Sequence, residues 1–389
     1  MRRNRWTLAT LVALVAAPLA MVPQPEWRRA HPDYVWSFPR DHGPHPGYKT
    51  EWWYFTGLVG DPGESTPTGG PPGASPPRLG FQFTLFKVGV VPDRPPSPSA
   101  WATADVFMGH MAVTDLSTGN HVFREVLYRA APPYAGFPGG VVRPGADTIA
   151  WSLAAPGTDG GWSLTTTGGG FALSGTAEGL SMDLQLDTVS ALVFQGPNGY
   201  SRKSAAEDRA SMYYSYTDLR TSGSITVEGS PRTVTGTGWM DHEFSSDPLD
   251  EEQVGWDWFS LRLGDGRAIM AFQLRDELGR PGYRHLTVVD PGGRPAYPDP
   301  SSWALTPDGP WTSPATGASY PQRWLLTSEA HGLALTVSAF HPATENVSRE
   351  VSGLYYWEGP VRVTGPAGDE LGAGYLEMTG YGEGSRPAL

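Results

Sequence analysis

Residues 236–241 read G-T-G-W-M-D and residues 372–377 read G-A-G-Y-L-E, so the same order of small, aromatic, apolar and acidic residues occurs twice. Four further short patterns recur in the same order in the two halves of the 389-residue chain. Each pattern alone is weak, but their shared order argues against chance and predicts one domain that has been duplicated. The four pairs are WWYF at 52–55 with WDWF at 256–259, FQF at 81–83 with FQL at 272–274, HMAVTD at 110–115 with HLTVVD at 285–290, and YY at 213–214 with YY at 355–356.

The duplicated domain is predicted to consist of β-strands. Aromatic residues make up 12% of the chain, and its 49 glycines and 38 prolines supply turns between short aromatic and β-branched runs. Beyond the first 25 residues, no long stretch has the 3.6-residue period of a helix. The expected fold class is all-β, with two tandem antiparallel barrels at 30–246 and 247–386, the first one longer because of Pro-rich insertions. A barrel of about eight strands can hold one small apolar ligand.

The N-terminal residues and the overall charge limit the location and the partners. Three arginines at positions 2, 3 and 5 precede an apolar run at 8–22, so residues 1–25 are predicted to be an export signal or an N-terminal anchor. The protein is expected to be exported, with no stable membrane span once the signal is removed. The net charge of −12 argues against nucleic acid and anionic membranes as partners. The chain has no cysteine, which excludes disulfides and thiol catalysis, and its oligomeric state stays open.

Asp241 follows Trp239 in the first quoted stretch and directly precedes His242 and Glu243. Because successive side chains of a strand point to opposite faces, Asp241 would share one face with Trp239 and Glu243. An inward carboxyl group would be desolvated, which raises its pKa and keeps it protonated as a general acid. The alternative is a carboxylate that satisfies a buried arginine or backbone N–H groups, and this alternative is favoured for Glu377 in the second copy.

Glu51 is a second candidate acid, because it opens the aromatic run at 52–55. Strand alternation would place Glu51 and Trp53 on one face and Trp52 and Tyr54 on the other. The simpler alternative is an edge charge beside aromatic rings that pack in the core.

Metal and cofactor chemistry are not predicted. Histidines and acids that could supply ligands occur, but the chain has no H-E-x-x-H pattern and no cysteine, and 42–45 reads most simply as an exposed Pro/Gly turn. A G-x-S-x-G nucleophile elbow, a phosphate loop and a dinucleotide G-x-G-x-x-G after a strand are also lacking. The residues considered as metal ligands are Asp41, His42, His45 and Glu51, with His110 or His242.

Together these motifs resemble the AttH-like proteins related to bacterial carotenoid 1,2-hydratase, which are often labelled as secreted hydrolases. The resemblance covers nearly the whole chain beyond the predicted signal and implies two lipocalin-like barrels side by side. It also implies a polyene-like or polyketide-like substrate and no cofactor, since the relatives include carotenoid hydratases, a fungal phytoalexin hydratase and natural-product cyclases. The motifs are EWWYFTG at 51–57, GFQFTLF at 80–86, GHMAVTD at 109–115, YYSYT at 213–217, GWMDHEFSS at 238–246, GWDWFS at 255–260 and GYLEMTGY at 374–381.

The resemblance also implies roles for single residues. Asp241 matches the aspartate expected to donate a proton in the hydratases, and His242 matches the histidine that follows it. Trp239 stands where the hydratases have a tyrosine, so the surroundings of the acid differ. In an enzyme of this kind, Trp239, Trp53 and Tyr214 are expected to shelter a carbocation through their π faces.

Three functions stay open on the sequence. The first is a cofactor-independent enzyme, hydratase-like or isomerase/cyclase-like, that acts on an apolar substrate at the junction of the two barrels. The second is a carrier of an apolar ligand without chemistry, and the third is a secreted hydrolase, for which the sequence shows no nucleophile. The candidate catalytic residues are Asp241, His242, Glu243 and Glu51, and the candidate substrate-binding residues are Trp52, Trp53, Tyr54, Gln82, His110, Tyr214, Trp239, Trp256 and Trp258.

Overall fold

The computed structural model describes residues 26–63, 78–99, 101–137, 147–205, 209–246, 248–382 and 385. These residues form β-strands joined by loops, and their helices are four short 3-10 turns, so the predicted all-β class is confirmed. The predicted export segment at 1–25 lies outside the described residues. Among the described residues, none of the helices has the length and apolar character needed to cross a membrane. The turns are η1 (Arg40–His42), η2 (Pro197–Gly199), η3 (Pro300–Ser302) and η4 (Glu329–His331).

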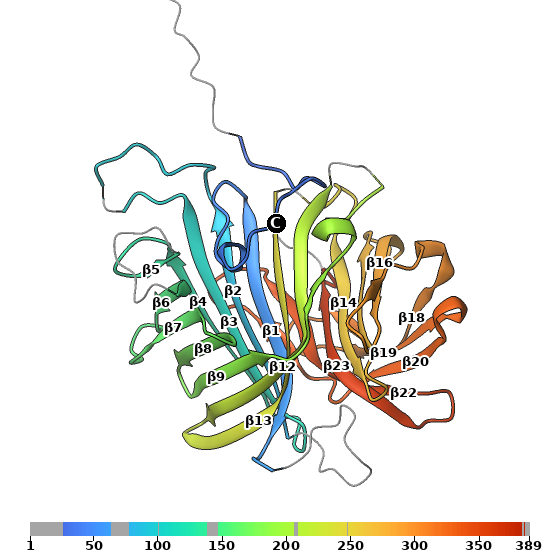
Figure 1. The fold of residues 1–389 in the computed structure, drawn as a ribbon. Coiled ribbons are helices and arrows are strands. Elements are labelled where there is room, and N and C mark those ends of the chain that lie inside the picture. Colours follow the sequence, from blue (N-terminus) through green and yellow to red (C-terminus); the bar gives the residue numbers. More distant parts are fainter. Residues whose placement is uncertain are drawn as a thin grey trace, which may run out of the picture.

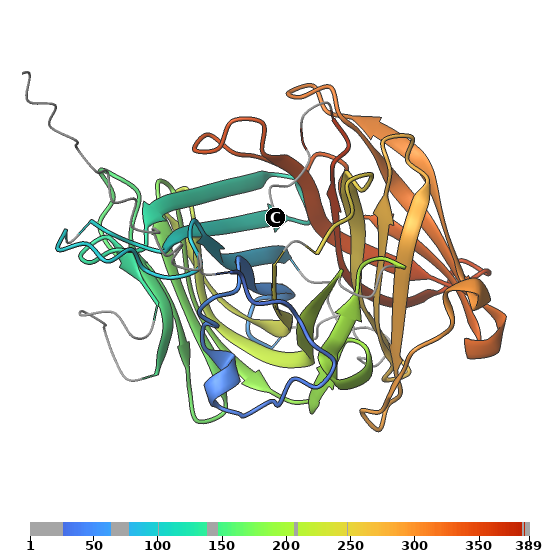
Figure 2. The same ribbon diagram turned by 90° about the horizontal axis from the view of Figure 1, so that it is seen from above.

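The first sheet is antiparallel and curls toward a barrel (Figures 1 and 2). Its strand order is β4-β3-β2-β1-β13-β12-β9-β8-β7-β6-β5, and β10 and β11 also pair with β12. The strands are β1 (Thr50–Gly60), β2 (Leu79–Gly89), β3 (Asp105–Asp115), β4 (His121–Arg129), β5 (Ala135–Gly136), β6 (Thr148–Leu153), β7 (Gly161–Thr166), β8 (Gly170–Ala177), β9 (Leu180–Thr188), β10 (Leu192–Phe194), β11 (Tyr200–Arg202), β12 (Ala210–Val227) and β13 (Ser230–Ser245).

The second sheet lies beside the first and is also antiparallel and curled (Figure 2). Its strand order is β17-β16-β15-β14-β23-β22-β20-β19-β18, and β21 also pairs with β22. The strands are β14 (Gly255–Leu263), β15 (Ala268–Arg275), β16 (Pro281–Val289), β17 (Pro295–Ala296), β18 (Ala304–Thr312), β19 (Ser319–Ser328), β20 (Leu333–Ala339), β21 (Glu345–Val347), β22 (Tyr355–Thr364) and β23 (Glu370–Thr379).

The two sheets repeat one another in strand order. The series β3-β2-β1-β13-β12-β9-β8-β7 in the first corresponds to β16-β15-β14-β23-β22-β20-β19-β18 in the second. Each repeated sequence pattern lies on a corresponding strand, for example WWYF on β1 and WDWF on β14. The prediction of two tandem, related antiparallel barrels is therefore confirmed, with each sheet curled toward a barrel.

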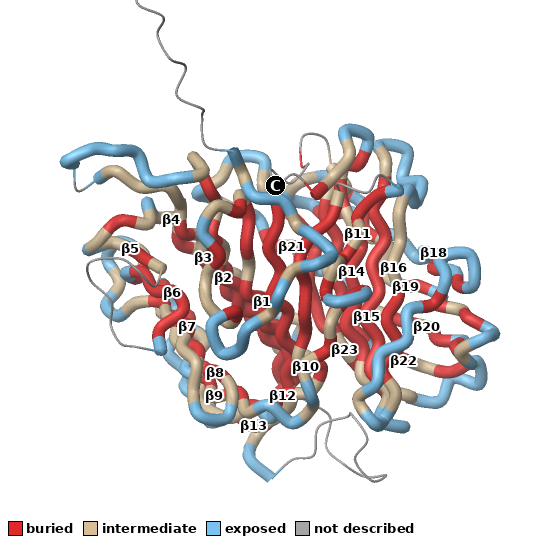
Figure 3. Tube along the Cα trace, turned by 45° about the horizontal axis from the view of Figure 1, so that its top comes forward, coloured by how far each residue is buried: buried red, intermediate tan, exposed pale blue. Residues whose placement is uncertain are grey.

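Apolar side chains form three layers: one inside each curled sheet and one between the sheets. Strands β1 and β15 contact two layers at once and are buried along nearly their whole length, which is why their sequences read as almost continuous apolar runs (Figure 3). Strands β8 and β9 lie away from the junction and show the alternating burial of a strand with one face in the core. In these four strands, a nearly continuous apolar pattern thus marks a strand at the junction, and an alternating pattern marks a strand away from it.

The repeated G-x-G pattern lets the acid-bearing strands β13 and β23 approach their neighbours closely. A Cβ atom at Gly236 would collide with the carbonyl oxygen of Leu58 on β1. A Cβ atom at Gly374 would collide with the carbonyl oxygen of Ser260 on β14 in the same way. Glycine is required at both positions because no side chain fits between the paired strands.

Candidate functional site

Strand β13 carries the predicted acid stretch, and its pleat separates the side chains as expected. Asp241 and Glu243 point toward the second sheet. His242 points into the first sheet, where its ring stacks on Trp53 with the centroids 4.9 Å apart. The stretch is therefore a strand and not a solvated turn, and its two acids face the junction.

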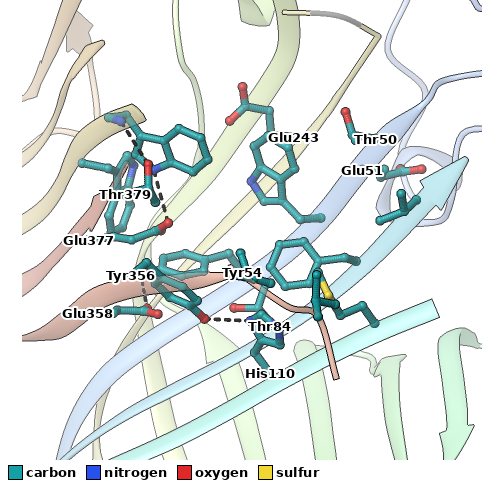
Figure 4. A pocket seen from close by; sticks show the side chains of 18 of the residues that line it. Thr50, Glu51, Tyr54, Thr84, His110, Glu243, Tyr356, Glu358, Glu377 and Thr379 are labelled. Carbon is teal, nitrogen blue, oxygen red and sulfur yellow. Dashed lines mark hydrogen bonds between the residues drawn. The ribbon is translucent and has the colours of Figure 1, made fainter. Parts of the chain in front are cut away.

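A cavity of about 400 Å³ lies between the two sheets (Figure 4). Strands β1, β2, β3, β12 and β13 line one wall, and β14, β15, β22 and β23 line the other. This volume is typical of sites for small molecules. The walls are mostly apolar, with aromatic side chains from both sheets: Trp52, Tyr54, Phe86, Tyr213, Trp256, Trp258, Phe272, Tyr355 and Tyr356.

Asp241 accepts hydrogen bonds from three donors in this cavity. Tyr213 Oη donates to Oδ2 at 2.6 Å, Ser215 Oγ donates to Oδ1 at 2.5 Å, and Trp239 Nε1 donates to Oδ1 at 2.7 Å. Burial raises the pKa of Asp241 to about 7, the three donors oppose this shift, and the charge of Glu243 adds to it. Asp241 can therefore hold and release a proton near neutral pH.

Glu243 differs from Asp241 because it is paired with a cation. Lys203 Nζ lies 2.7 Å from Glu243 Oε1, and Ser211 Oγ donates to the same oxygen. The ammonium group also lies 4.2 Å from the centroid of the Phe272 ring in the second sheet. Sequence analysis missed Lys203, since no motif marks it.

Glu358 and Glu377 form a carboxyl pair on the opposite wall (Figure 4). Tyr54 Oη donates to Glu358 Oε1 at 2.5 Å, and Trp256 Nε1 donates to Glu377 Oε1 at 3.2 Å. Burial raises the pKa of both, that of Glu377 to about 8, and the charge of Glu377 raises that of Glu358 further. Sequence analysis favoured a structural role for Glu377 and missed Glu358, although Glu358 follows Tyr356 of the repeated YY pattern by two residues and so shares its face.

Gln82 and His110 line the cavity from neighbouring strands of the first sheet. His110 Nδ1 and Tyr356 Oη are hydrogen-bonded at 2.7 Å, which joins the two walls (Figure 4). Burial lowers the pKa of His110 to about 3, so its ring is neutral at physiological pH. Gln82 Nε2 donates to Thr84 Oγ1 at 2.5 Å, and Gln82 Oε1 has no hydrogen-bond partner within the described part of the chain.

Six of the nine predicted substrate-binding residues line the cavity, and three do not. Trp53 and Tyr214 lie in the core of the first sheet, so their rings cannot shelter a cation in this cavity as expected. The reason is strand alternation, because their neighbours Tyr54 and Tyr213 are the residues that face the cavity. Trp239 lies between the sheets and supports the acid through its indole N–H without lining the cavity. The six that line it are Trp52, Tyr54, Gln82, His110, Trp256 and Trp258.

Glu51 and His242 meet at the first sheet in a buried ionic cluster. Glu51 Oε1 lies 2.6 Å from His45 Nδ1 and 2.8 Å from His242 Nε2. Lys87 Nζ lies 3.6 Å from Glu51 Oε2. Burial alone would raise the pKa of Glu51, but the charge of His45, the histidine hydrogen bonds and Lys87 hold it well below its usual range. Glu51 borders the cavity, yet it is an ionised anchor and not a proton donor.

His45, Glu51 and His242 are also the one group of potential metal ligands that the described residues bring together, with one ligand atom from each within 4.8 Å of the others. Ligand atoms around a tetrahedral zinc ion lie about 3.3 Å apart. The separations of 2.6 and 2.8 Å are those of hydrogen bonds, so the geometry is that of an ion-pair network. His45 was predicted to lie in an exposed turn, but it is only 8% exposed because its ring stacks on Phe244. Asp41 joins the same network, with Oδ1 at 3.5 Å from His45 Nε2.

The comparison with known proteins agrees with this fold. The AttH-like family model matches residues 29–381. The chain belongs to the AttH-like family. The predicted family resemblance is therefore confirmed for this AttH-like protein.

Solved structures of the same fold come from bacteria and fungi and include named enzymes. A Nitrosomonas europaea protein described as an AttH is 31% identical, with a TM-score of 0.76 over 92% of this chain and 100% of that chain. Kievitone hydratase from Nectria haematococca is 14% identical, with a TM-score of 0.59 over 91% of this chain and 97% of its own. CghA is 11% identical, with a TM-score of 0.53 over 86% and 88%. The last two similarities show a shared fold. Among curated proteins, none matches the sequence.

Proposed function

We propose that this AttH-like protein is an enzyme that acts on a small apolar molecule between its two sheets, with Asp241 as the proton donor. The observation that carries the proposal is the Asp241 carboxyl group, which is 2% exposed, forms no ion pair among the described residues and faces a mostly apolar cavity. A pure carrier needs apolar walls, but it gains nothing from a buried ionisable group, which costs stability. A buried acid with a pKa near 7 is instead suited to proton transfer.

The proposed reaction uses a carbon–carbon double bond of the substrate. The proton of Asp241 bonds to one alkene carbon through the π electron pair, which leaves a cation at the other carbon. The rings of Tyr54, Trp256 and Trp258 line the cavity and would stabilise this cation through their π faces. In a hydration, a water oxygen bonds to the cationic carbon and a water proton returns to the Asp241 carboxylate. In an isomerisation, a proton lost from a carbon beside the cation restores the acid. In a cyclisation, the π electron pair of a second double bond first forms the ring bond to the cationic carbon, and a proton lost beside the new cation restores the acid.

The name of one structural relative supports testing hydration first. Kievitone hydratase shares the fold over most of both chains, and CghA, another relative, has been solved together with Sch210972. The proposal takes from these relatives a class of reaction, and it takes the acid from the geometry of this chain.

The experiment has two stages. Native mass spectrometry before and after organic extraction first identifies any apolar molecule that co-purifies with the protein. That molecule, or a panel of polyenes and terpenoids, is then incubated in heavy-oxygen water with wild type, Asp241→Asn and Asp183→Asn. Asp183 is an exposed carboxylate on β9, so its variant is a matched control.

We expect heavy oxygen in the product, a rate at least about 100-fold lower for Asp241→Asn, and an unchanged rate for Asp183→Asn. Conversion without heavy oxygen would point to isomerisation or cyclisation. Tight binding without conversion by wild type would show a carrier, and an unaffected rate in Asp241→Asn would remove the proposed proton donor.

The proposal includes action outside the cytoplasm, supported by the arginines at 2, 3 and 5 and the apolar run at 8–22. Cell fractionation with N-terminal sequencing of the mature protein tests it. A protein retained in the cytoplasm with its first residues intact would contradict export.

A further inference from the structure

The Glu358–Glu377 pair has no part in the proton transfer proposed above, yet it occupies the wall opposite Asp241. The antiparallel register places Glu358 directly opposite Glu377. Cross-strand neighbours have Cβ atoms about 5 Å apart, and like charges at this spacing destabilise a sheet. The two lysines that line the cavity, Lys87 and Lys203, are paired with other carboxylates, and neither acid of the pair forms an ion pair within the described ranges.

Two facing carboxyl groups without a cation, Glu358 buried and Glu377 partly exposed to the cavity, retain protons because ionising them would place unpaired charge in a mostly apolar site. The raised pKa values of Glu358 and Glu377 agree with this argument. Around neutral pH, both groups are therefore O–H donors and not carboxylates.

The two carboxyl oxygens of Glu377 differ in their hydrogen bonding. Its Oε1 accepts the hydrogen bond from Trp256, whereas Oε2 has no hydrogen-bond partner among the residues that the structure describes. Glu358, in contrast, is contacted at both oxygens, by Tyr54 Oη at 2.5 Å and by Asn346 Nδ2 at 3.4 Å. The proton of Glu377 thus belongs on Oε2, and its acceptor has to come from within the cavity.

We propose that Glu377 donates a hydrogen bond to a carbonyl oxygen of the substrate, so that the natural ligand is an apolar molecule with a ketone or acyl group. Glu358 is a positioning residue: burial and the charge of Glu377 keep it protonated, so it supplies no counter-charge that would stabilise an ionised Glu377. The ligand would span the cavity, with its carbonyl group at the second sheet and its reacting carbon near Asp241 at the first. The inference rests on the proposed function, because it assigns one end of the same substrate.

The groups that face Glu377 set the pH range in which it can donate. Glu358 faces it from β22, and the charges of Asp241 and Glu243 on β13 raise its pKa, while Lys203 neutralises part of the effect of Glu243. Glu51 and Lys87 also line the cavity, but they are paired with each other in the buried ionic cluster of the first sheet. Four further titratable side chains on the walls are neutral throughout the range: the pKa values of Tyr54, Tyr213 and Tyr356 are raised by burial, and that of His110 is lowered to about 3.

The test compares three probes of nearly one shape: the ketone 2-acetylnaphthalene, the hydrocarbon 2-isopropenylnaphthalene and the amine 1-(2-naphthyl)ethylamine. Equilibrium dialysis gives their dissociation constants with wild type, Glu377→Gln and Glu377→Leu at about pH 6.5 and about pH 9.5, on either side of the Glu377 pKa. We expect wild type to bind the ketone about tenfold more tightly than the hydrocarbon at the lower pH. The preference should disappear at the higher pH and in Glu377→Leu. Glu377→Gln retains an N–H donor and should keep the preference at both pH values.

A second readout is the C=O stretch of the bound ketone, which a hydrogen bond moves to lower frequency. We expect this shift in wild type and in Glu377→Gln, and its loss in Glu377→Leu. Equal binding of ketone and hydrocarbon by wild type at the lower pH, or tighter binding of the amine than of the ketone at that pH, would overturn the inference and leave the role of Asp241 standing. Failure of all three probes to bind would overturn it together with the proposed function. Asp241 also titrates between the two pH values, in wild type and in Glu377→Gln alike. A preference that is lost at the higher pH in wild type but kept in Glu377→Gln therefore assigns the effect to Glu377 even where the leucine variant does not fold.

Discussion

Tyr54 and Trp258 occupy matching positions in the two repeats and meet edge to face across the junction, with ring centroids 5.0 Å apart and an interplanar angle of 87°. Each also sends a hydrogen bond toward the acid of the other sheet. Tyr54 Oη donates to Glu358, whereas Trp258 Nε1 donates to Tyr213 Oη at 3.0 Å, and Tyr213 donates to Asp241. Each sheet therefore tunes a carboxyl group that the other sheet carries.

Removal of one donor should make Asp241 a weaker acid. Tyr213→Phe deletes a hydrogen bond that favours the ionised carboxylate, so the pKa of Asp241 should rise above its wild-type value of about 7. Carbon NMR titration of labelled aspartate carboxyl groups measures this shift without a substrate. Tyr216→Phe on the same strand serves as the control, because Tyr216 makes no hydrogen bond to Asp241. An unchanged or lower pKa in Tyr213→Phe would contradict the account.

The buried acid should also make stability depend on pH. The pKa of Asp241 is 3.8 in the unfolded chain and about 7 in the folded protein. Its contribution to the free energy of unfolding is therefore fully present below about pH 4 and is lost as the pH rises to about 7. Above that range the ionised group costs about 4 kcal/mol. Asp241→Asn removes this cost, so urea denaturation should show the free energy of unfolding of the variant rising relative to that of wild type between about pH 4 and about pH 7. The variant also lacks the Asp241 charge that raises the pKa of Glu377, so ionisation of Glu377 costs less in the variant and the difference acts in the same direction. A difference that does not change with pH would argue against a buried neutral Asp241.

The ionic cluster around Glu51 should be important for folding. Glu51→Gln leaves Lys87 and His45 without their buried anion and should lower the free energy of unfolding by about 3–5 kcal/mol at neutral pH. Because the pKa of Glu51 is lowered in the fold, this contribution is present above the ordinary glutamate pKa of 4.5 and is lost as the pH falls below it. Asp308→Asn, which breaks an exposed ion pair with Arg323, should have a much smaller effect because solvent screens that pair. Chemical denaturation measures both, and equal effects would contradict the buried network.

The close-contact glycines of the acid-bearing strands β13 and β23 should not tolerate a methyl group. Gly374→Ala would push a Cβ atom into the Ser260 carbonyl and should destabilise the protein by about 1–3 kcal/mol. Gly168→Ala is the matched control, since no atom lies within 4 Å of its added Cβ. Thermal denaturation of the two variants decides the point, and a stable Gly374→Ala protein would show that the strands can separate.

Much of this arrangement could be predicted from the sequence because strand geometry depends on short-range order. The repeated patterns identified the duplicated sheets, and alternation along 239–244 separated Asp241 from His242. The same rule, applied to 51–55, separated Trp52 and Tyr54 from Glu51 and Trp53, although it could not say which set would meet the other sheet.

Contacts between distant segments could not be predicted in this way. Lys203 pairs with Glu243 from a loop, and Glu358 receives its hydrogen bond from Tyr54, which lies 304 residues earlier in the chain. The N-terminal segment that carries His45 packs on the first sheet through rings and charges, a placement that no local pattern indicates. Long-range pairing of this kind depends on the assembled fold.

The edge-to-face contact joins Tyr54 to Trp258, the residue at the matching position of the other repeat. In assemblies of identical subunits, such self-matching contacts occur on a twofold axis, where one surface patch meets itself. The two sheets thus meet as the subunits of a symmetric homodimer would, although one chain carries both. Asp241 and Glu377 occupy matching positions of the two repeats, yet their surroundings differ, one with three hydrogen-bond donors and one with a single donor. Duplication thereby gave the cavity two unlike ends, which a symmetric dimer cannot offer to a substrate whose own ends differ.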